Sequence, residues 1–230
     1  MSNDKTFSKL KLLASNDESG NIRTFVFETG GLEWIAGQSQ NYVLRQAGDT
    51  EKSNQRRFTI SSSPSEKVIH ISTRVTASSF KQTLNSLAIC DEIEASNLEG
   101  DFIWEEEPSD PIIMVAGGIG ITPYRSILLS RQALGKRLNA TLLYFNRTEE
   151  VAFRDELETL ESAHPEFKVM TIFGQVLSGE SILEHEPNAA RQTVYLSGPE
   201  AVVESISSEF CQLNIKTKQD WFPGYDQHNY

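Results

Sequence analysis

A glycine-rich segment, Gly117-Gly118-Ile119-Gly120-Ile121-Thr122-Pro123, carries the strongest chemical signal in the chain. It follows an apolar run at residues 112–116, and its threonine and proline favour the start of a helix. The first N–H groups of a helix have no partner within it and attract phosphate. The segment therefore predicts a nucleotide site with Thr122 as the N-cap. The alternative is an ordinary glycine-rich turn, because neither GxGxxG nor GxxxxGK[ST] is present.

A second signal consists of Arg56, Phe58 and Thr59, on a segment that we expect to be a strand. Alternate residues of a strand point to opposite faces, so Arg56 and Phe58 share one face and Thr59 lies on the other. An arginine can bind a phosphate through two N–H groups, an aromatic ring can pack on a planar ligand, and a hydroxyl can bond a ring nitrogen. An ordinary strand edge has the same composition, so this pattern alone decides nothing.

Composition narrows the class of protein. The chain has 230 residues and a net charge of −11, which disfavours binding to nucleic acid. Its two cysteines, Cys90 and Cys211, cannot supply a four-thiolate metal or iron–sulfur site, and the scattered histidines indicate no metal site. No apolar run is long enough to span a bilayer, and the first residues lack the apolar core of a signal peptide. We therefore expect a cytoplasmic protein that is not inserted in a membrane.

The charge is uneven along the chain. Residues 43–81 hold seven basic and three acidic side chains, although the whole chain is acidic. This basic window is either a chance cluster on a solvated surface or a local site for anions.

The residues described above lie in two parts of the chain that differ in their pattern of apolar and turn residues. Before residue 105, short apolar segments separated by turn residues predict an antiparallel barrel or sandwich. After residue 111, alternating strands and helices predict a parallel sheet covered on both faces. The charged, proline-containing stretch 105–111 predicts a linker, so we expect domains at 1–105 and 106–230. The first domain should contain strands at 9–14, 22–28, 41–44, 58–62 and 68–75 and a helix at 78–87. The second should contain strands at 112–116, 140–145, 167–173 and 193–196 and helices at 123–134, 149–163, 180–185 and 200–213.

In this order and spacing, the two signals resemble the ferredoxin–NADP reductase superfamily. Residues 56–59 are similar to its flavin motif Arg-x-Tyr-Ser/Thr, and residues 117–123 match its GGxGxTP nucleotide motif. Residues 197–199 resemble its Cys-Gly-Pro turn, and 36–38 and 97–102 resemble segments of its barrel. Residues 222–225 resemble aromatic tails of bacterial members. The resemblance implies a flavin-binding antiparallel barrel followed by an α/β domain that binds the nicotinamide nucleotide.

The resemblance also implies roles for individual residues. Arg56 contacts the flavin phosphates, Phe58 packs on the flavin, and Thr59 bonds near its N5 atom. Ser197 lies near the nicotinamide and Phe222 near the flavin ring, so Thr59, Ser197 and Phe222 are the candidate catalytic residues. The remaining candidates on the flavin side are Thr73, Ser78, Ser79 and Phe80. Those on the nucleotide side are Gly117, Gly118, Gly120, Thr122, Pro123, Asn146, Arg147, Gly198 and Pro199, with Asn146 and Arg147 at the adenosine ribose.

Three residues depart from the family pattern. Phe58 replaces a tyrosine, Val75 replaces a glycine of the pyrophosphate loop, and Ser197 replaces the cysteine. FAD is still expected in preference to FMN, with NAD(P)H as the co-substrate.

The resulting interpretation is an FAD-dependent NAD(P)H oxidoreductase that passes electrons to a separate acceptor, either a ferredoxin- or flavodoxin-type carrier or a small molecule. Two alternatives stay open. One is a reductase that uses free flavin as its substrate, and the other is a non-catalytic module that senses nucleotides on the same fold.

Overall fold

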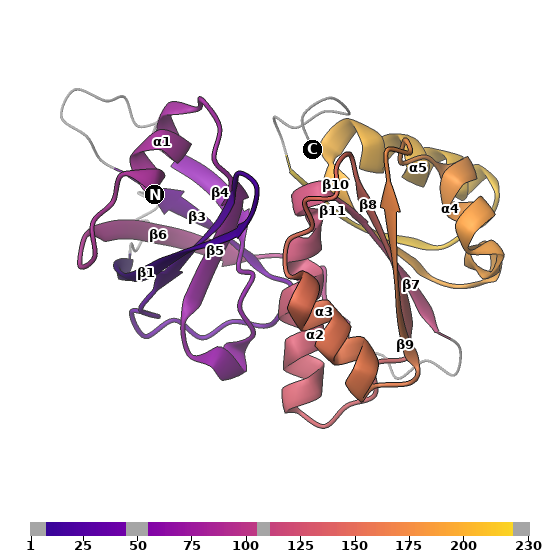
Figure 1. Ribbon diagram of the computed structural model, residues 1–230, viewed down its shortest axis with the longest axis horizontal. Coiled ribbons are helices and arrows are strands. Elements are labelled where there is room, and N and C mark those ends of the chain that lie inside the picture. Colours follow the sequence, from indigo (N-terminus) through magenta and orange to yellow (C-terminus); the bar gives the residue numbers. More distant parts are fainter. Residues whose placement is uncertain (1–7, 45–54, 105–110, 223–230) are drawn as a thin grey trace, which may run out of the picture. The chain divides into compact units, whose positions relative to one another are not determined.

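The computed structural model describes residues 8–44, 55–104 and 111–222, which form two compact units (Figure 1). The first unit comprises residues 1–103 together with 125–130, and the second comprises residues 104–124 and 131–230. The linker predicted at 105–111 lies almost wholly outside the described ranges, so the predicted domain boundary stays a prediction.

An antiparallel sheet of six strands forms the first unit, in the order β4-β3-β6-β1-β2-β5. The N–H group of Ser61, just after β4, donates to the carbonyl of His70 on β5 at 3.0 Å, which links the two outer strands of the sheet. The antiparallel barrel architecture expected for this part of the chain is confirmed. Its elements are β1 (Ser8–Ser19), β2 (Ile22–Phe27), β3 (Ser39–Val43), β4 (Gln55–Thr59), η1 (Pro64–Glu66), β5 (Ile69–Arg74), α1 (Ser79–Asn85) and β6 (Glu92–Glu99).

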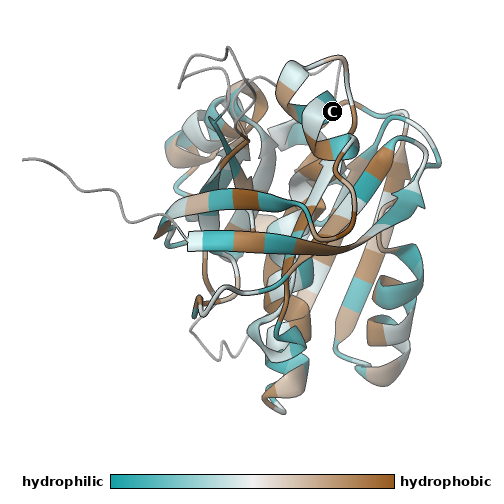
Figure 2. Ribbon diagram, turned by 90° about the vertical axis from the view of Figure 1, so that its left-hand side faces the viewer, coloured by the Kyte–Doolittle hydropathy of each residue, from teal (hydrophilic) through white to brown (hydrophobic). Residues whose placement is uncertain are grey.

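The core of the first unit follows from period-2 alternation. Figure 2 shows hydrophobic and hydrophilic residues alternating along its strands. One face of each strand therefore contributes large side chains to a shared core. Buried members of this core are Leu10, Leu12, Phe25, Phe27, Tyr42, Phe58, Ile60, Ile69, Ile71, Phe80, Leu84 and Ile93.

Two predictions for the first unit were wrong in detail. The strand expected at 58–62 is β4, which ends at Thr59, because the chain then turns into the short helix η1, where Ser63 is the N-cap and Pro64 the first residue. Strand β6 was not predicted. Asn97 has a left-handed φ of 52°, and the register with β3 shifts nearby, so the period-2 pattern is interrupted.

The second unit is a five-stranded parallel sheet in the order β11-β10-β7-β8-β9, as predicted for its class. Strands β7 and β10 are buried along their whole length. The strands are β7 (Ile112–Gly117), β8 (Ala140–Asn146), β9 (Phe167–Phe173), β10 (Val194–Pro199) and β11 (Thr217–Phe222). The helices are η2 (Gly118–Ile121), α2 (Thr122–Ala133), α3 (Arg154–Ala163), α4 (Gly179–His185), η3 (Pro187–Arg191) and α5 (Glu200–Gln212).

Two features of the second unit differ from the predictions. Helix α3 begins at Arg154 rather than at residue 149, because Phe153 takes a left-handed conformation (φ 59°) with its side chain buried. Strand β11 was not predicted, since it has no apolar run and pairs with β10 at the edge of the sheet. Within the described ranges, no helix combines the length and the apolar character needed to cross a bilayer.

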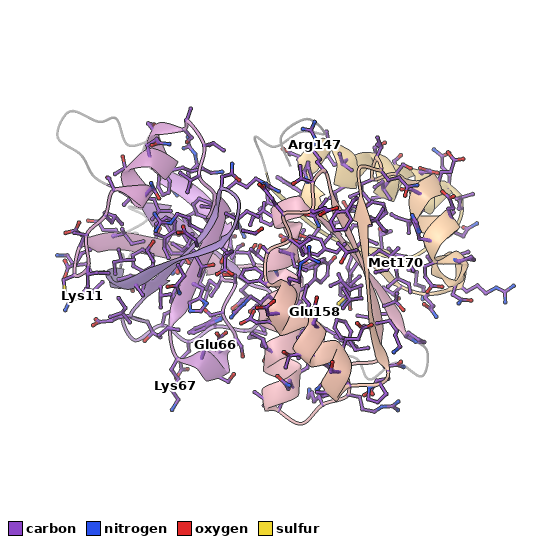
Figure 3. The ribbon with its side chains drawn as sticks, in the orientation of Figure 1. Lys11, Glu66, Lys67, Arg147, Glu158 and Met170 are labelled. Carbon is purple, nitrogen blue, oxygen red and sulfur yellow. The ribbon has the colours of Figure 1, made fainter. Side chains whose placement is uncertain are left out.

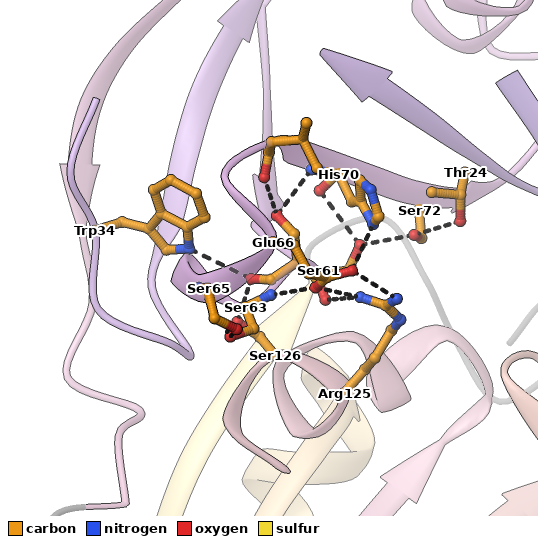
Figure 4. Close-up of polar contacts among 12 residues, drawn as sticks. Thr24, Trp34, Ser61, Ser63, Ser65, Glu66, His70, Ser72, Arg125 and Ser126 are labelled. Atoms are coloured by element: carbon orange, nitrogen blue, oxygen red, sulfur yellow. Dashed lines mark hydrogen bonds and ion pairs between the residues drawn. The ribbon is translucent and has the colours of Figure 1, made fainter. Parts of the chain in front are cut away.

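Glu66 forms a charged hydrogen-bond cluster in the first unit (Figure 4). Its carboxylate accepts from the Ser63 N–H at 2.6 Å and from both terminal nitrogens of Arg125, at 3.0 and 3.1 Å, and lies 3.9 Å from Nδ1 of His70. Burial by itself raises the pKa of Glu66, but Arg125, the Ser63 N–H and the nearby His70 together lower it below its usual value. The folded state is thus stabilised while Glu66 is ionised.

The lowered pKa of Glu66 predicts how the free energy of unfolding changes with pH. Above the usual carboxyl range, the wild type should exceed Glu66→Gln in free energy of unfolding by about 1–3 kcal/mol. The difference should shrink as the pH falls through the lowered pKa, because the folded state then loses its preference for the ionised carboxyl. Urea denaturation of both proteins at a series of pH values measures it. A difference that stays constant from pH 7 to pH 3 would contradict the assignment.

Candidate functional site

The glycine-rich segment runs from the carboxyl end of β7 directly into a helix. Gly118 has a left-handed φ of 54°, and residues 118–121 form the 3₁₀ turn η2, which continues into α2. The prediction that Thr122 caps the helix was wrong: the 3₁₀ turn η2 precedes it, Thr122 itself has helical dihedral angles (φ −58°, ψ −45°), and its hydroxyl donates to the carbonyl of Ile119 at 3.1 Å. The N-cap is Gly117, which makes no side-chain hydrogen bond, so the N–H groups of the first turn are capped by no side chain.

Gly120 allows two backbone segments to meet. A Cβ atom on Gly120 would lie 2.2 Å from the carbonyl oxygen of Ser197 and 2.9 Å from the nitrogen of Gly198. No side chain fits at that distance, so the turn after β7 packs on the turn of β10 only with glycine at this position. Gly198 faces Gly117 on the neighbouring strand, where an added Cβ would make ordinary contact at 3.5 Å. The structure thus brings together residues 117–120 and 197–198, which the sequence analysis had assigned to one site.

This meeting point is a topological switch in the sheet. Strands β7, β8 and β9 follow one another outward in one direction, whereas the next strand, β10, lies on the other side of β7. In open α/β sheets, ligands bind outside the carboxyl ends of the strands at such a point. The glycine-rich turn and the Ser197 turn therefore occupy the expected position of a nucleotide site.

Two residues that the sequence analysis missed support these turns. Tyr124 is fully buried, and its hydroxyl lies 2.8 Å from the carbonyl of Tyr195 and 3.0 Å from that of Val115, which bridges β10 and β7. Burial raises the pKa of Tyr124, so the group is a neutral donor. The Ser197 hydroxyl donates to Asp220 on β11 at 3.5 Å. Asp220 had no sequence signal because β11 itself was not predicted.

Asn146 is the last residue of β8. This strand pairs with β7, which leads into the glycine-rich turn. Asn146 is 2% exposed, and neither its side-chain oxygen nor its side-chain nitrogen has a hydrogen-bond partner within the described ranges. Its backbone carbonyl accepts from Gly174 at 3.0 Å, so the residue itself is fixed. A buried amide without partners costs about 1–3 kcal/mol. This cost indicates a role for Asn146 beyond packing. Arg147, the next residue, is exposed in the loop after β8 (Figure 3).

Asn146→Leu tests that role. The substitution removes an unsatisfied amide and keeps a similar volume, so the thermal midpoint should stay the same or rise. If the amide binds the nucleotide, affinity for NAD(P)H should fall about tenfold, which corresponds to about 1.4 kcal/mol. Calorimetric titration with each nucleotide, beside a thermal melt, measures both quantities. Unchanged affinity together with lower stability would mean that the amide serves only the fold.

In the first unit, the structure distinguishes the two neighbouring arginines of β4. Arg57 is engaged: its Nε donates to the Ser39 hydroxyl at 2.7 Å, and its Nη1 donates to Glu99 at 2.5 Å. Arg56 is exposed, bonds only the adjacent Gln55 carbonyl at 2.7 Å among its hydrogen bonds in the described region, and lies 5.9 Å from the Phe80 ring centre. Arg56 is therefore the arginine whose guanidinium is available to an anion.

Phe58 and Thr59 differ from each other in how they are placed. The Phe58 ring is 9% exposed and packs between Tyr42 and Phe80, with ring centres 6.2 and 5.7 Å away. It offers little surface for a ligand, so its predicted packing on a flavin stays a prediction. Thr59 is 2% exposed, and its hydroxyl has no hydrogen-bond partner in the part of the chain that the structure describes. A buried hydroxyl without a partner is what a ligand with a ring nitrogen acceptor would satisfy.

The positions of the other flavin-side candidates give less evidence for a contact to a ligand. Thr73 is buried on β5, and its hydroxyl donates to the Arg74 carbonyl at 3.4 Å. Ser78 is the N-cap of α1 but makes no side-chain cap hydrogen bond, and Ser79 is exposed. The Phe80 side chain is 2% exposed in the barrel core, so only its backbone can serve a ligand.

Phe222 lies at the end of β11, in register with Pro199 of the Ser197 turn. Residues 223–225 of the predicted aromatic tail lie outside the described residues. The placement of Phe222 near a flavin ring stays a prediction.

Comparison with known proteins agrees with these observations. Residues 114–208 match the family model of the oxidoreductase NAD-binding domain, which covers the glycine-rich turn and the Ser197 turn. The chain is 24% identical over 218 residues to flavohemoprotein A of Dictyostelium discoideum, covering 86% of this chain and 55% of the relative. It is 31% identical over 161 residues to NADH-cytochrome b5 reductase 1 of Mortierella alpina, covering 63% of this chain and 50% of the relative. The chain thus spans about half the length of these relatives.

The fold itself is shared more widely. A crystal structure described as a ferredoxin NADP+ reductase from Neisseria gonorrhoeae with bound FAD and NADP superposes with a TM-score of 0.77 at 15% identity. The superposition covers 95% of this chain and 99% of that one. At this identity, the likeness shows that the two chains share a fold.

Proposed function

The chain belongs to the ferredoxin–NADP reductase superfamily, and we propose that it is an FAD-dependent oxidoreductase that oxidises NAD(P)H and delivers the electrons to a separate acceptor. The observation that carries this proposal is a pair of buried polar side chains that have no hydrogen-bond partner among the described residues. Thr59 lies at the end of the flavin-motif strand, and Asn146 lies at the carboxyl edge of the nucleotide-binding sheet. For each of them, the resemblance to the family implies a contact to a ligand.

On the nucleotide side, the chain supplies a cradle of backbone groups. The uncapped first turn at residues 118–120 offers N–H groups to a pyrophosphate, and Gly120 keeps that turn against the Ser197 turn. Asn146 offers both a donor and an acceptor to the adenosine ribose. Ser197, held by its hydrogen bond to Asp220, orients the nicotinamide end.

On the flavin side, Arg56, which has no acidic partner among the described residues, is the cation proposed for the flavin phosphates, and the Thr59 hydroxyl is the proposed donor for a ring nitrogen. When bound, the flavin supplies the redox chemistry by accepting hydride from the nicotinamide and releasing electrons singly or in pairs. The chain's own contribution is to bind, align and shield the two ligands. The two cysteines of the given sequence cannot form a four-cysteine iron–sulfur cluster, so the proposed acceptor is not such a cluster within these residues.

The basic window gives limited support to an acidic electron carrier as that molecule. Arg45 and Lys52 lie outside the described residues, Arg57 is paired with Glu99, and Lys81 is 8% exposed. Lys67 is exposed and points away from the first unit (Figure 3). Most basic side chains in the described part of the window are thus paired or buried within the barrel. A small molecule is therefore an equal candidate for the acceptor.

Flavin occupancy after purification tests the proposal against its alternatives. We expect a yellow protein that retains close to one FAD per chain after desalting. Little bound flavin, with NAD(P)H oxidation restored in proportion to added flavin, would favour a reductase that uses free flavin as substrate. Bound nucleotide without any oxidation, whether or not flavin is added, would favour the non-catalytic module.

A further inference from the structure

Helix α2 carries an arginine, Arg125, that belongs to the first unit. Residues 125–130 of this helix belong to the first unit, whereas Thr122, one helical turn before Arg125, belongs to the glycine-rich turn of the second. The Arg125 side chain is 7% exposed and extends from the helix toward Glu66 and Ser61 (Figure 4). It binds the Glu66 carboxylate through both terminal nitrogens, at 3.0 and 3.1 Å, and donates to the Ser61 carbonyl at 2.9 Å.

The partners of Arg125 lie in the segment 61–66, which follows the flavin strand. Ser61 comes two residues after Thr59, whose buried hydroxyl has no hydrogen-bond partner among the described residues. Ser61 is also held from the barrel side, because its hydroxyl bonds that of Ser72 at 2.7 Å and its N–H donates to His70. The chain immediately after Thr59 is therefore fixed by the barrel on one side and by helix α2 on the other.

A second residue of the same helix also donates a hydrogen bond to a backbone carbonyl in the segment 61–66. The Ser126 hydroxyl donates to the Ser62 carbonyl at 2.6 Å, and that carbonyl also accepts from the Trp34 ring nitrogen at 3.3 Å. Adjacent residues of α2 thus bind the carbonyls of adjacent residues after β4. We call residues 61–66 together with Arg125 and Ser126 the α2 clasp.

We propose that Arg125, paired with Glu66, is a positioning residue for the reaction: the α2 clasp, which lies within the first unit, fixes the orientation of Thr59. The inference rests on the proposed function. The clasp contacts the segment that follows Thr59, so it acts on the reaction through Thr59. Transfer of a hydride is sensitive to such placement, since an error of about 1 Å can cost about a hundredfold in rate.

The test is single-turnover reduction of bound flavin by NADH and NADPH in Glu66→Gln and Arg125→Lys, with rates expressed per flavin-loaded chain. We expect the rate at saturating nucleotide to fall about tenfold or more, while the half-saturating nucleotide concentration changes less than about threefold. Glu92→Gln is the matched control, because it breaks the exposed Lys9–Glu92 pair (2.9 Å) in the same barrel. It should keep the wild-type rate.

Wild-type rates per loaded chain in Glu66→Gln and Arg125→Lys, even with lower stability or lower occupancy, would overturn the inference and leave a purely structural clasp. If those variants do not fold, Ser126→Ala decides. This substitution removes the hydrogen bond from Ser126 to the Ser62 carbonyl, so the rate of flavin reduction should fall. An unchanged rate overturns the inference. Failure of the wild type itself to be reduced would instead overturn the proposed function, and the inference would fall with it.

Discussion

Gly120→Ala is expected to lower the affinity for NAD(P)H by about a hundredfold or more. The added Cβ would stand 2.2 Å from the Ser197 carbonyl oxygen, and backbone atoms on both sides cannot yield as a flexible side chain would. The turn after β7 must therefore move away from the β10 turn, and its N–H groups move with it. Losing two charge-assisted hydrogen bonds to a pyrophosphate costs about 3–6 kcal/mol. Calorimetric titration with NADH and NADPH measures the loss.

Gly135→Ala is the matched control for that substitution. Gly135 follows the other end of α2 with a left-handed φ of 66°, and an added Cβ would meet nothing within 4 Å. The variant should lose about 1 kcal/mol of stability from backbone strain and keep its nucleotide affinity. Wild-type affinity in Gly120→Ala, or an equal loss in both variants, would show that the turn does not form the nucleotide site.

Arg56→Ala is expected to weaken flavin binding by about ten- to a hundredfold. A charge-assisted contact to phosphate contributes about 1.5–3 kcal/mol, and Arg56 has no acidic partner among the described residues that would compete for it. The barrel should keep its stability, because the Arg56 side chain is exposed and holds no other strand. Equilibrium dialysis of FAD against wild type and variant gives the two dissociation constants.

For the neighbouring Arg57 we expect the opposite result, a loss of stability without a loss of FAD affinity. Its guanidinium binds Ser39 on β3 and Glu99 at the end of β6. Arg57→Ala should therefore lower the free energy of unfolding of the barrel while FAD affinity per folded chain stays near the wild-type value. If Arg57→Ala loses flavin and Arg56→Ala does not, the assignment of Arg56 to the phosphates is wrong.

Much of the second unit was predictable because strong periodic signals coincide with structure. The strand predicted at 167–173 has the observed bounds of β9, and the helix predicted at 200–213 differs from α5 by one residue. The motif Gly117 to Pro123 located the nucleotide turn, although the start of the helix was misjudged. A run of 3₁₀ geometry before Thr122 depends on the left-handed Gly118 and on packing against β10, which local propensity does not encode.

What the sequence could not reveal depends on contacts between distant residues. Glu66 and Arg125 are separated by 59 positions, and although Glu66 forms a local capping box with Ser63, no sequence pattern connects it to Arg125. The availability of Arg56 is visible only once Arg57 is seen to be paired with Glu99. The unpartnered state of Thr59 and Asn146 is likewise a property of the packed structure, because any threonine or asparagine in a sequence has the same bonding capacity.

The most direct test of the central claim is anaerobic rapid mixing of the FAD-loaded chain with NADH and, separately, with NADPH. The readout is the visible absorbance band of the oxidised flavin. We predict that at least one nucleotide bleaches this band at a rate that saturates with nucleotide concentration. A chain that holds FAD and binds both nucleotides, yet keeps its flavin oxidised with each, would contradict the account.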